Sequence, residues 1–189
     1  MFCDSCIKSI KYLFSFNQIK IQKIIPGEVT VLFDLELHTE SQIEEILSIN
    51  GFKVIKNNEE ILVEQIKIAI IELIHKSNNM NSIIRNSDYL VEKLGYSYQY
   101  LSNIFSKKEN RTLEQFIILH RIEKVKELIS YKELTLSEIA FKMGYSSVQY
   151  LSTQFKNITG LSVNQLKKTE NFNRISLNEI YPKLFSLLI

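Results

Sequence analysis

The chain has 189 residues, of which 45% are hydrophobic and 23% are charged, the balance of a globular protein with one or two domains. Five Gly and two Pro are few for this length and argue against long loops and sheet-rich folds. The net charge of +2 is unevenly spread. Residues 1–66 hold six Lys/Arg and ten Asp/Glu, a net of −4, whereas residues 67–189 hold seventeen and eleven, a net of +6. A basic part favours contact with a phosphate backbone through counterion release.

The sequence predicts neither a membrane span nor a secretory signal. It has no run of about 18 apolar residues, which a membrane-crossing helix needs. Residues 1–16 include Asp4 and two cysteines and lack a basic start and a small-residue cleavage site. We therefore expect a cytoplasmic protein, in which Cys3 and Cys6 stay reduced.

A CxxC motif, FCDSC, opens the chain and places Cys3 and Cys6 at the start of a predicted amphipathic helix through Phe14. The positive end of a helix favours thiolates, and two thiolates suit Cu(I) or Zn(II). A redox dithiol and two inert cysteines are the alternatives. Structural zinc usually takes four ligands, and three scattered histidines do not complete such a set: His38, His75 and His120.

Alternating and helical patterns predict the order α-β-β-α-β for the N-terminal part. A strand over 19–25, a turn at Pro26-Gly27 and a strand over 28–33 come first. A helix capped by Thr39 or Ser41 follows, Asn50-Gly51 ends it, and a short strand covers 52–55.

This part of the chain resembles the heavy-metal-associated fold. Met1, Cys3 and Cys6 match the Met-x-Cys-x-x-Cys loop of that family, and Gly51-Phe52 matches its Gly-aromatic pair. The resemblance implies a ferredoxin-like domain over residues 1–58 that binds a soft metal ion through the two cysteines. One departure is that the strand preceding the loop in the family does not precede it in this sequence, which predicts an open sheet edge.

A polar break over 57–60 marks the predicted domain boundary, and a helix over 61–76 and a polar loop over 77–86 follow it. Two similar helical hairpins come next. The motif Gly95-Tyr96-Ser97 matches Gly144-Tyr145-Ser146, with one residue fewer before the shared Tyr-Leu-Ser. In the second hairpin Thr135 and Glu138 have capping-box spacing, and Gly144 has the position of a helix exit. The apolar faces of the two hairpins are predicted to be buried: Leu101 and Phe105 in the first copy, and Leu136, Ile139, Ala140, Met143, Leu151, Phe155 and Ile158 in the second.

The second helix of each hairpin carries a stripe of short hydrogen-bonding side chains with single cations. Amides and hydroxyls of this kind read base edges in the DNA major groove, Asn and Gln pair with adenine, and Lys meets phosphate. A solvated face of an ordinary hairpin is the alternative, and the repeat favours DNA reading. The candidate DNA-binding residues are Tyr98, Gln99, Ser102, Asn103, Ser106 and Lys107, then Ser147, Val148, Gln149, Ser152, Thr153 and Lys156.

A helix capped by Thr112 and Gln115 and running to Tyr131 is predicted to separate the hairpins. Its cations are expected to be solvated or structural: Arg121, Lys124 and Lys126.

Residues 66–168 resemble the AraC family of transcription regulators, whose DNA-binding domain joins two helix-turn-helix units through one helix. The stretch GYSSVQYLSTQFKNITGLSVNQLK looks like the family's second-unit signature, and Arg121-Ile122 with Val125 resembles its linker helix. The resemblance implies that both recognition helices enter successive major-groove segments about 34 Å apart. One departure is Glu109-Asn110-Arg111, where the family often has Glu-Thr-Gly. Few Arg occur on the outward faces, so readout would use amides, hydroxyls and DNA shape.

These features predict an α+β chain with a metal-sensor-like domain over 1–58, a DNA-binding domain over 59–170 and a tail over 171–189. The predicted function is sequence-specific regulation at double-stranded promoter DNA together with the transcription machinery, with a homodimer left open. No catalytic constellation is present in the sequence, and an enzyme is not expected. The alternatives are a thiol redox protein, a metal carrier, and a DNA-binding regulator whose N-terminal domain only dimerises.

Overall fold

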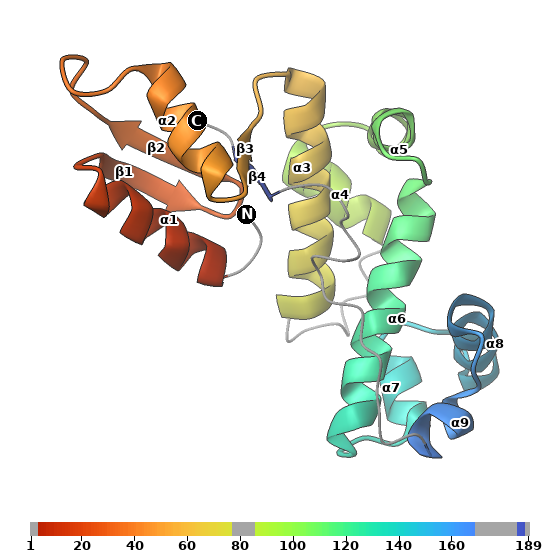
Figure 1. The fold of residues 1–189 in the computed structure, drawn as a ribbon. Helices are drawn as coiled ribbons and strands as arrows, with labels where there is room; N and C mark the ends of the chain where they lie inside the picture. The colour runs from red at the N-terminus through yellow and green to blue at the C-terminus, as the bar shows by residue number, and fades with distance from the viewer. Residues whose placement is uncertain (1–3, 77–85, 169–184, 188–189) are drawn as a thin grey trace. The chain divides into compact units, whose positions relative to one another are not determined.

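The computed structural model describes residues 4–76, 86–168 and 185–187 (Figure 1). The chain divides into two compact units, one over residues 1–68 and 181–189 and the other over residues 69–180. None of the helices in these ranges is long and apolar enough to cross a membrane.

The first unit follows the predicted order of helices and strands. Its elements are α1 (Asp4–Phe16), β1 (Lys20–Ile25), β2 (Glu28–Leu32), α2 (Glu40–Ile49), β3 (Phe52–Val54), the start of α3 (Asn58–Ile71) and β4 (Phe185–Leu187). A capping box begins α2, because Thr39 accepts a hydrogen bond from the backbone of Gln42 and the Gln42 side chain accepts one from Thr39 N–H. Local signals therefore predicted the order from α1 to β3 correctly, whereas no strand was predicted in the tail, where β4 lies.

The described strands do not confirm the single ferredoxin-like sheet that the resemblance implies. The described strands form two separate pairs, antiparallel β1–β2 and parallel β3–β4. In a ferredoxin-like sheet the first strand lies between the strands that correspond to β2 and β3. Among the described residues no strand occupies that position. The ferredoxin-like architecture is thus not confirmed, and of the predicted tail only β4 lies within the described residues.

The core of the first unit forms between the helices and the strands. Ile10 and Phe14 of α1 are fully buried with Ile43 and Leu47 of α2, and Val29 of β2 joins the same cluster. The spacing of four residues in each pair places both side chains on one helix face. Full burial of each such side chain is worth about 1.5–3 kcal/mol, so this cluster holds the helices to the strands.

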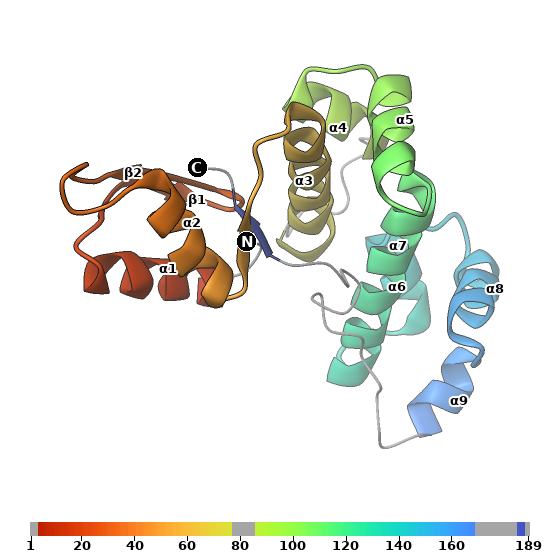
Figure 2. The same ribbon diagram turned by 45° about the horizontal axis from the view of Figure 1, so that its top comes forward.

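The second unit is helical. It contains the end of α3, the π-helical turn η1 (Glu72–Lys76), α4 (Asn86–Leu94), α5 (Tyr98–Lys108), α6 (Leu113–Tyr131), α7 (Leu136–Lys142), α8 (Val148–Thr159) and α9 (Val163–Lys168). Helices α4–α5 and α7–α8 are the two predicted hairpins, and α6 runs between them (Figure 2). Of the predicted loop over 77–86, Asn86 begins α4 and the other positions lie outside the described residues.

Helix α6 supplies the central packing surface of this unit. Ten of its nineteen residues are buried. The ring of Phe116 lies 5.0 Å, centroid to centroid, from that of Phe105 in α5. The prediction that Ile158 is buried is wrong, since its side chain is 44% exposed. Ile158 lies in the last turn of α8, directly before the chain exits through left-handed Gly160.

Candidate nucleic-acid interface

The turn of the second hairpin is fixed by a Schellman motif at Gly144. Gly144 N–H donates to Phe141 C=O at 3.0 Å, and Tyr145 N–H donates to Ala140 C=O at 2.9 Å. Gly144 has φ +70°, a left-handed conformation that side chains disfavour, and Gly95 has φ +74° at the same point of the first hairpin. The helix exit predicted at Gly144 is confirmed. Both turns pass through a left-handed glycine, but Gly95 N–H donates to Val91 C=O at 2.9 Å, four residues back, in place of the bond that Gly144 makes.

Serine caps begin both second helices. The Ser97 hydroxyl oxygen accepts from Tyr100 N–H at 3.3 Å, and that of Ser147 accepts from Tyr150 N–H at 3.1 Å. Ser97 therefore corresponds to Ser147, and the extra residue of the second copy lies in its turn. In this register Gln99 matches Gln149.

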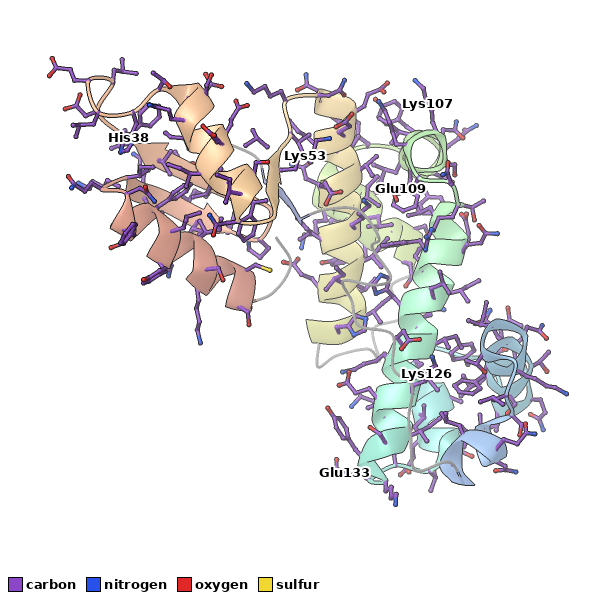
Figure 3. All side chains as sticks on the ribbon, in the orientation of Figure 1. His38, Lys53, Lys107, Glu109, Lys126 and Glu133 are labelled. Atoms are coloured by element: carbon purple, nitrogen blue, oxygen red, sulfur yellow. The ribbon has the colours of Figure 1, made fainter. Side chains whose placement is uncertain are left out.

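Each second helix buries one face and turns a polar face outward. Leu101 and Phe105 of α5 are fully buried, as are Leu151 and Phe155 of α8. The candidate residues lie on the remaining surface of these helices, and Lys107 points away from α5 (Figure 3). Seven are exposed, namely Gln99, Asn103, Ser106, Lys107, Gln149, Thr153 and Lys156, and five are half-buried, namely Tyr98, Ser102, Ser147, Val148 and Ser152.

Tyr98 has an internal hydrogen-bond partner. Its hydroxyl donates to Glu114 Oε1 of α6 at 2.8 Å. Partial burial and this carboxylate both raise the pKa of the Tyr98 phenol well above its usual range. The phenol therefore stays protonated and anchors α5 to α6.

Exposed tyrosines beside the candidate residues were not predicted as part of the site. The rings of Tyr96 and Tyr100 stack with centroids 5.3 Å apart, and both side chains are about half exposed. In the second hairpin Tyr145 and Tyr150 are 5.9 Å apart, and Tyr150 is exposed. The repeated Tyr-Leu-Ser motif carried this signal, because its tyrosine is exposed in both copies, whereas Tyr145 of the second Gly-Tyr motif is buried.

The three histidines make structural contacts. His38 Nε2 lies 2.7 Å from the carbonyl oxygen of Asn17, and His75 Nε2 lies 3.2 Å from His120 Nδ1. Burial, with the charges of His75 and Arg111, lowers the pKa of His120 to about 3. His120 is thus a neutral core residue at physiological pH.

The structure gives partial information on the predicted metal ligands. Cys6 is buried in the first turn of α1, within the apolar cluster of Ile10 and Phe14, and Cys3 lies outside the described residues. Within the described ranges, no group of three or more His, Cys, Asp or Glu side chains could hold a metal ion. Metal binding at Cys3 and Cys6 stays a prediction.

Residues 90–169 match a family model described as a helix-turn-helix domain. An uncharacterized HTH-type transcriptional regulator in the cgkA 5′ region of Pseudoalteromonas carrageenovora is 32% identical over 111 residues, which cover 56% of this chain and 64% of that protein. The Msm operon regulatory protein of Streptococcus mutans is 30% identical over 106 residues, or 56% of this chain and 36% of that protein. The chain thus spans less than two thirds of the length of these relatives.

Among solved structures, the C-terminal domain of AraT, a response regulator from Geobacillus stearothermophilus, is similar to this chain at 25% identity and a TM-score of 0.45. The similar region covers 62% of this chain and 95% of the AraT domain. The two relatives are described as an HTH-type transcriptional regulator and an operon regulatory protein. The two capped hairpins around α6 agree with the match to the family model, and residues 90–169 are thus similar to a helix-turn-helix domain.

Proposed function

We propose that the chain is a sequence-specific regulator that reads double-stranded promoter DNA with α5 and α8, alongside the transcription machinery. The observation that supports this most is the repetition of one device. Each helix starts at a serine cap, buries a Leu and a Phe, and turns a Gln in its first turn outward. Two copies of the same polar face on one linker helix suit two consecutive major-groove segments.

The charge of the two helices supports the same conclusion. Neither α5 nor α8 contains Asp or Glu, whereas α4, α6 and α7 do. A helix without carboxylates meets no like-charge repulsion from phosphate, and its positive N-terminal end attracts phosphate. Lys107 and Lys156 add a cation to each helix.

The experiment is selection of binding sites by the full chain from a random-sequence duplex library. The selected duplex is then compared with an unselected one by fluorescence anisotropy at fixed salt. We expect two preferred segments separated by about one helical turn, 10–10.5 bp, and affinity for the selected duplex at least 100-fold higher than for the random one. Equal affinity for both duplexes would contradict the proposal.

The response to a soft metal at Cys3 and Cys6 is a separate part of the proposal. Its support is the CxxC spacing and the resemblance of residues 1–58. The test is DNA affinity of the full chain with and without added Cu(I) or Zn(II), for the wild type and for Cys3→Ser. A metal-dependent change in affinity that Cys3→Ser abolishes supports the response, and an identical change in both proteins contradicts it.

A further inference from the structure

One side chain of α6 contacts both hairpins. Arg121 Nη2 donates to Asn86 Oδ1 at 3.2 Å, and Asn86 is the first residue of α4 in the first hairpin. The guanidinium carbon of Arg121 also lies 6.0 Å from the ring centroid of Tyr145, in the turn of the second hairpin. The interaction with Asn86 is a hydrogen bond to a neutral amide, and that with Tyr145 is a cation–π contact. Arg121 therefore links the first residue of α4 to the turn between α7 and α8.

The contact continues into α8. The hydroxyl of Tyr145 donates to Gln154 Oε1 at 2.6 Å. Burial raises the pKa of Tyr145 to about 12, although the positive charge of Arg121 acts to lower it. The hydroxyl therefore keeps its proton at neutral pH and remains a donor to Gln154. A continuous polar path runs from Asn86 through Arg121 and Tyr145 to Gln154.

The first hairpin has no equivalent of this path at the matching positions. Tyr96 stands where Tyr145 does but is 48% exposed, whereas Tyr145 is 8% exposed. Counted from the serine caps, buried Ile104 occupies the position of Gln154. Tyr145, which is buried, and Gln154 thus occur together in the second hairpin, the one whose turn Arg121 contacts. The first hairpin forms the same pair of helices without them, so the hairpin fold alone does not require this pair.

We propose that Arg121 is a positioning residue that fixes the orientation of α8 relative to the first hairpin and so couples the two recognition helices on DNA. This inference rests on the proposed function. A planar guanidinium can donate to an amide along its edge and face an aromatic ring at the same time, which a lysine ammonium does not reproduce. The fixed spacing of α5 and α8 then depends on the Arg121 side chain as well as on α6.

The test uses the full chain and the duplex selected by the wild type, in three forms. The first form has both segments intact, the second has one segment scrambled, and the third has two base pairs inserted between the segments. For the wild type we expect insertion to lower affinity at least tenfold. For Arg121→Leu we expect weaker binding to the intact duplex and an insertion penalty below threefold, with Arg121→Lys in between. Lys124→Leu, one turn away on α6 and paired with Glu127 at 2.8 Å, is the matched loss of a cation and should keep the wild-type penalty.

The ratio between duplexes separates positioning from simple stabilisation. A residue that only stabilises the fold would change affinity for all three duplexes by the same factor, and this outcome would overturn the inference. If Arg121→Leu does not fold, Asn86→Ala and Tyr145→Phe break the path on either side and should also shrink the insertion penalty. A wild type without sequence preference would contradict the proposed function, whereas unchanged penalties in these variants contradict the coupling alone.

Discussion

The hydroxyl of Tyr98 and the carboxylate of Glu114 lie 2.8 Å apart and join the first residue of α5 to the first turn of α6. The bond is possible because the Ser97 cap and the Thr112 cap start these two helices near one another. Glu114 is also well placed for its charge, since the N-terminal turn of a helix favours a carboxylate. The pair therefore ties the start of α5 to the start of α6.

Tyr98→Phe should therefore lower the free energy of unfolding and leave base preference almost unchanged. Loss of one exposed hydrogen bond to a carboxylate is expected to cost about 1 kcal/mol. Urea unfolding gives the first quantity, and the affinity ratio of selected to random duplex gives the second. A large loss of base preference in Tyr98→Phe would show instead that the hydroxyl leaves Glu114 to contact DNA.

Base readers and phosphate contacts should respond differently to substitution. Gln149→Ala and Asn103→Ala are each expected to relax preference for one base pair by roughly 1–3 kcal/mol, if the amide forms a bidentate pair with adenine. Lys156→Ala should weaken binding to all sequences alike and reduce the salt slope by about 1. Anisotropy titrations at several salt concentrations measure both quantities. Lys11→Ala, on the exposed side of α1, is the control cation and should change neither. Uniform losses in all three variants would mean that these helices do not read bases.

Gly144→Ala should destabilise the second hairpin through backbone strain. A left-handed residue with a Cβ costs roughly 1–2 kcal/mol, and Gly144 has φ +70°. An added Cβ would have only Arg121 Nη2 nearby, at 4.0 Å, so a steric clash adds little. Gly95→Ala, at φ +74° with open space around it, should cost a similar amount. Thermal unfolding compares the two variants, and a negligible shift in both would show that the turns relax.

The buried His120 should make stability depend on pH. Its pKa is about 3 in the folded chain, against an ordinary value of 6.5 for an unfolded histidine, so between these values the unfolded chain binds a proton that the folded chain does not. The contribution of His120 to stability is thus complete above pH 6.5 and falls with decreasing pH, at up to about 1.4 kcal/mol per pH unit.

Lowering the pH from 7 to 5 should therefore cost about 2 kcal/mol through His120. Urea unfolding of the wild type and His120→Phe at both pH values measures this contribution as the difference between their pH dependences. His38→Gln retains His120 and should keep the pH dependence that His120 contributes. Identical pH dependences for the wild type and His120→Phe would contradict the buried neutral imidazole.

Local signals in the sequence were sufficient for most elements. The caps at Thr39, Thr112 and Thr135 all form capping boxes, because the cap serves groups within three residues of itself. Contacts between elements distant in the sequence could not be predicted from it. The bond between His75 and His120 and the path through Arg121 depend on how helices pack, which no local pattern encodes. Arg121 was expected to be solvated or structural, and its geometry makes it structural.

The N-terminal part shows why a match to a short motif is weaker evidence for a fold than an internal repeat. CxxC is a four-residue pattern, and the position of Cys6 in an apolar cluster is compatible with simple packing of a small side chain. The helical repeat spans two whole hairpins, and each copy has a serine cap and a left-handed glycine at the same points. Agreement at many positions constrains the fold far more than agreement at two.

Helix α6 has a consequence for protein engineering. Phe116 packs on α5, His120 on the π-helical turn η1, and Arg121 on the turn before α8, so neighbouring residues of one helix serve different partners. A hairpin grafted from a related protein would lack the α6 surface on which its own sequence packs. Under the proposed function, the smallest part that can be transplanted is therefore the whole helical unit. Base preference is then more readily redesigned by exchanging outward side chains than by exchanging hairpins.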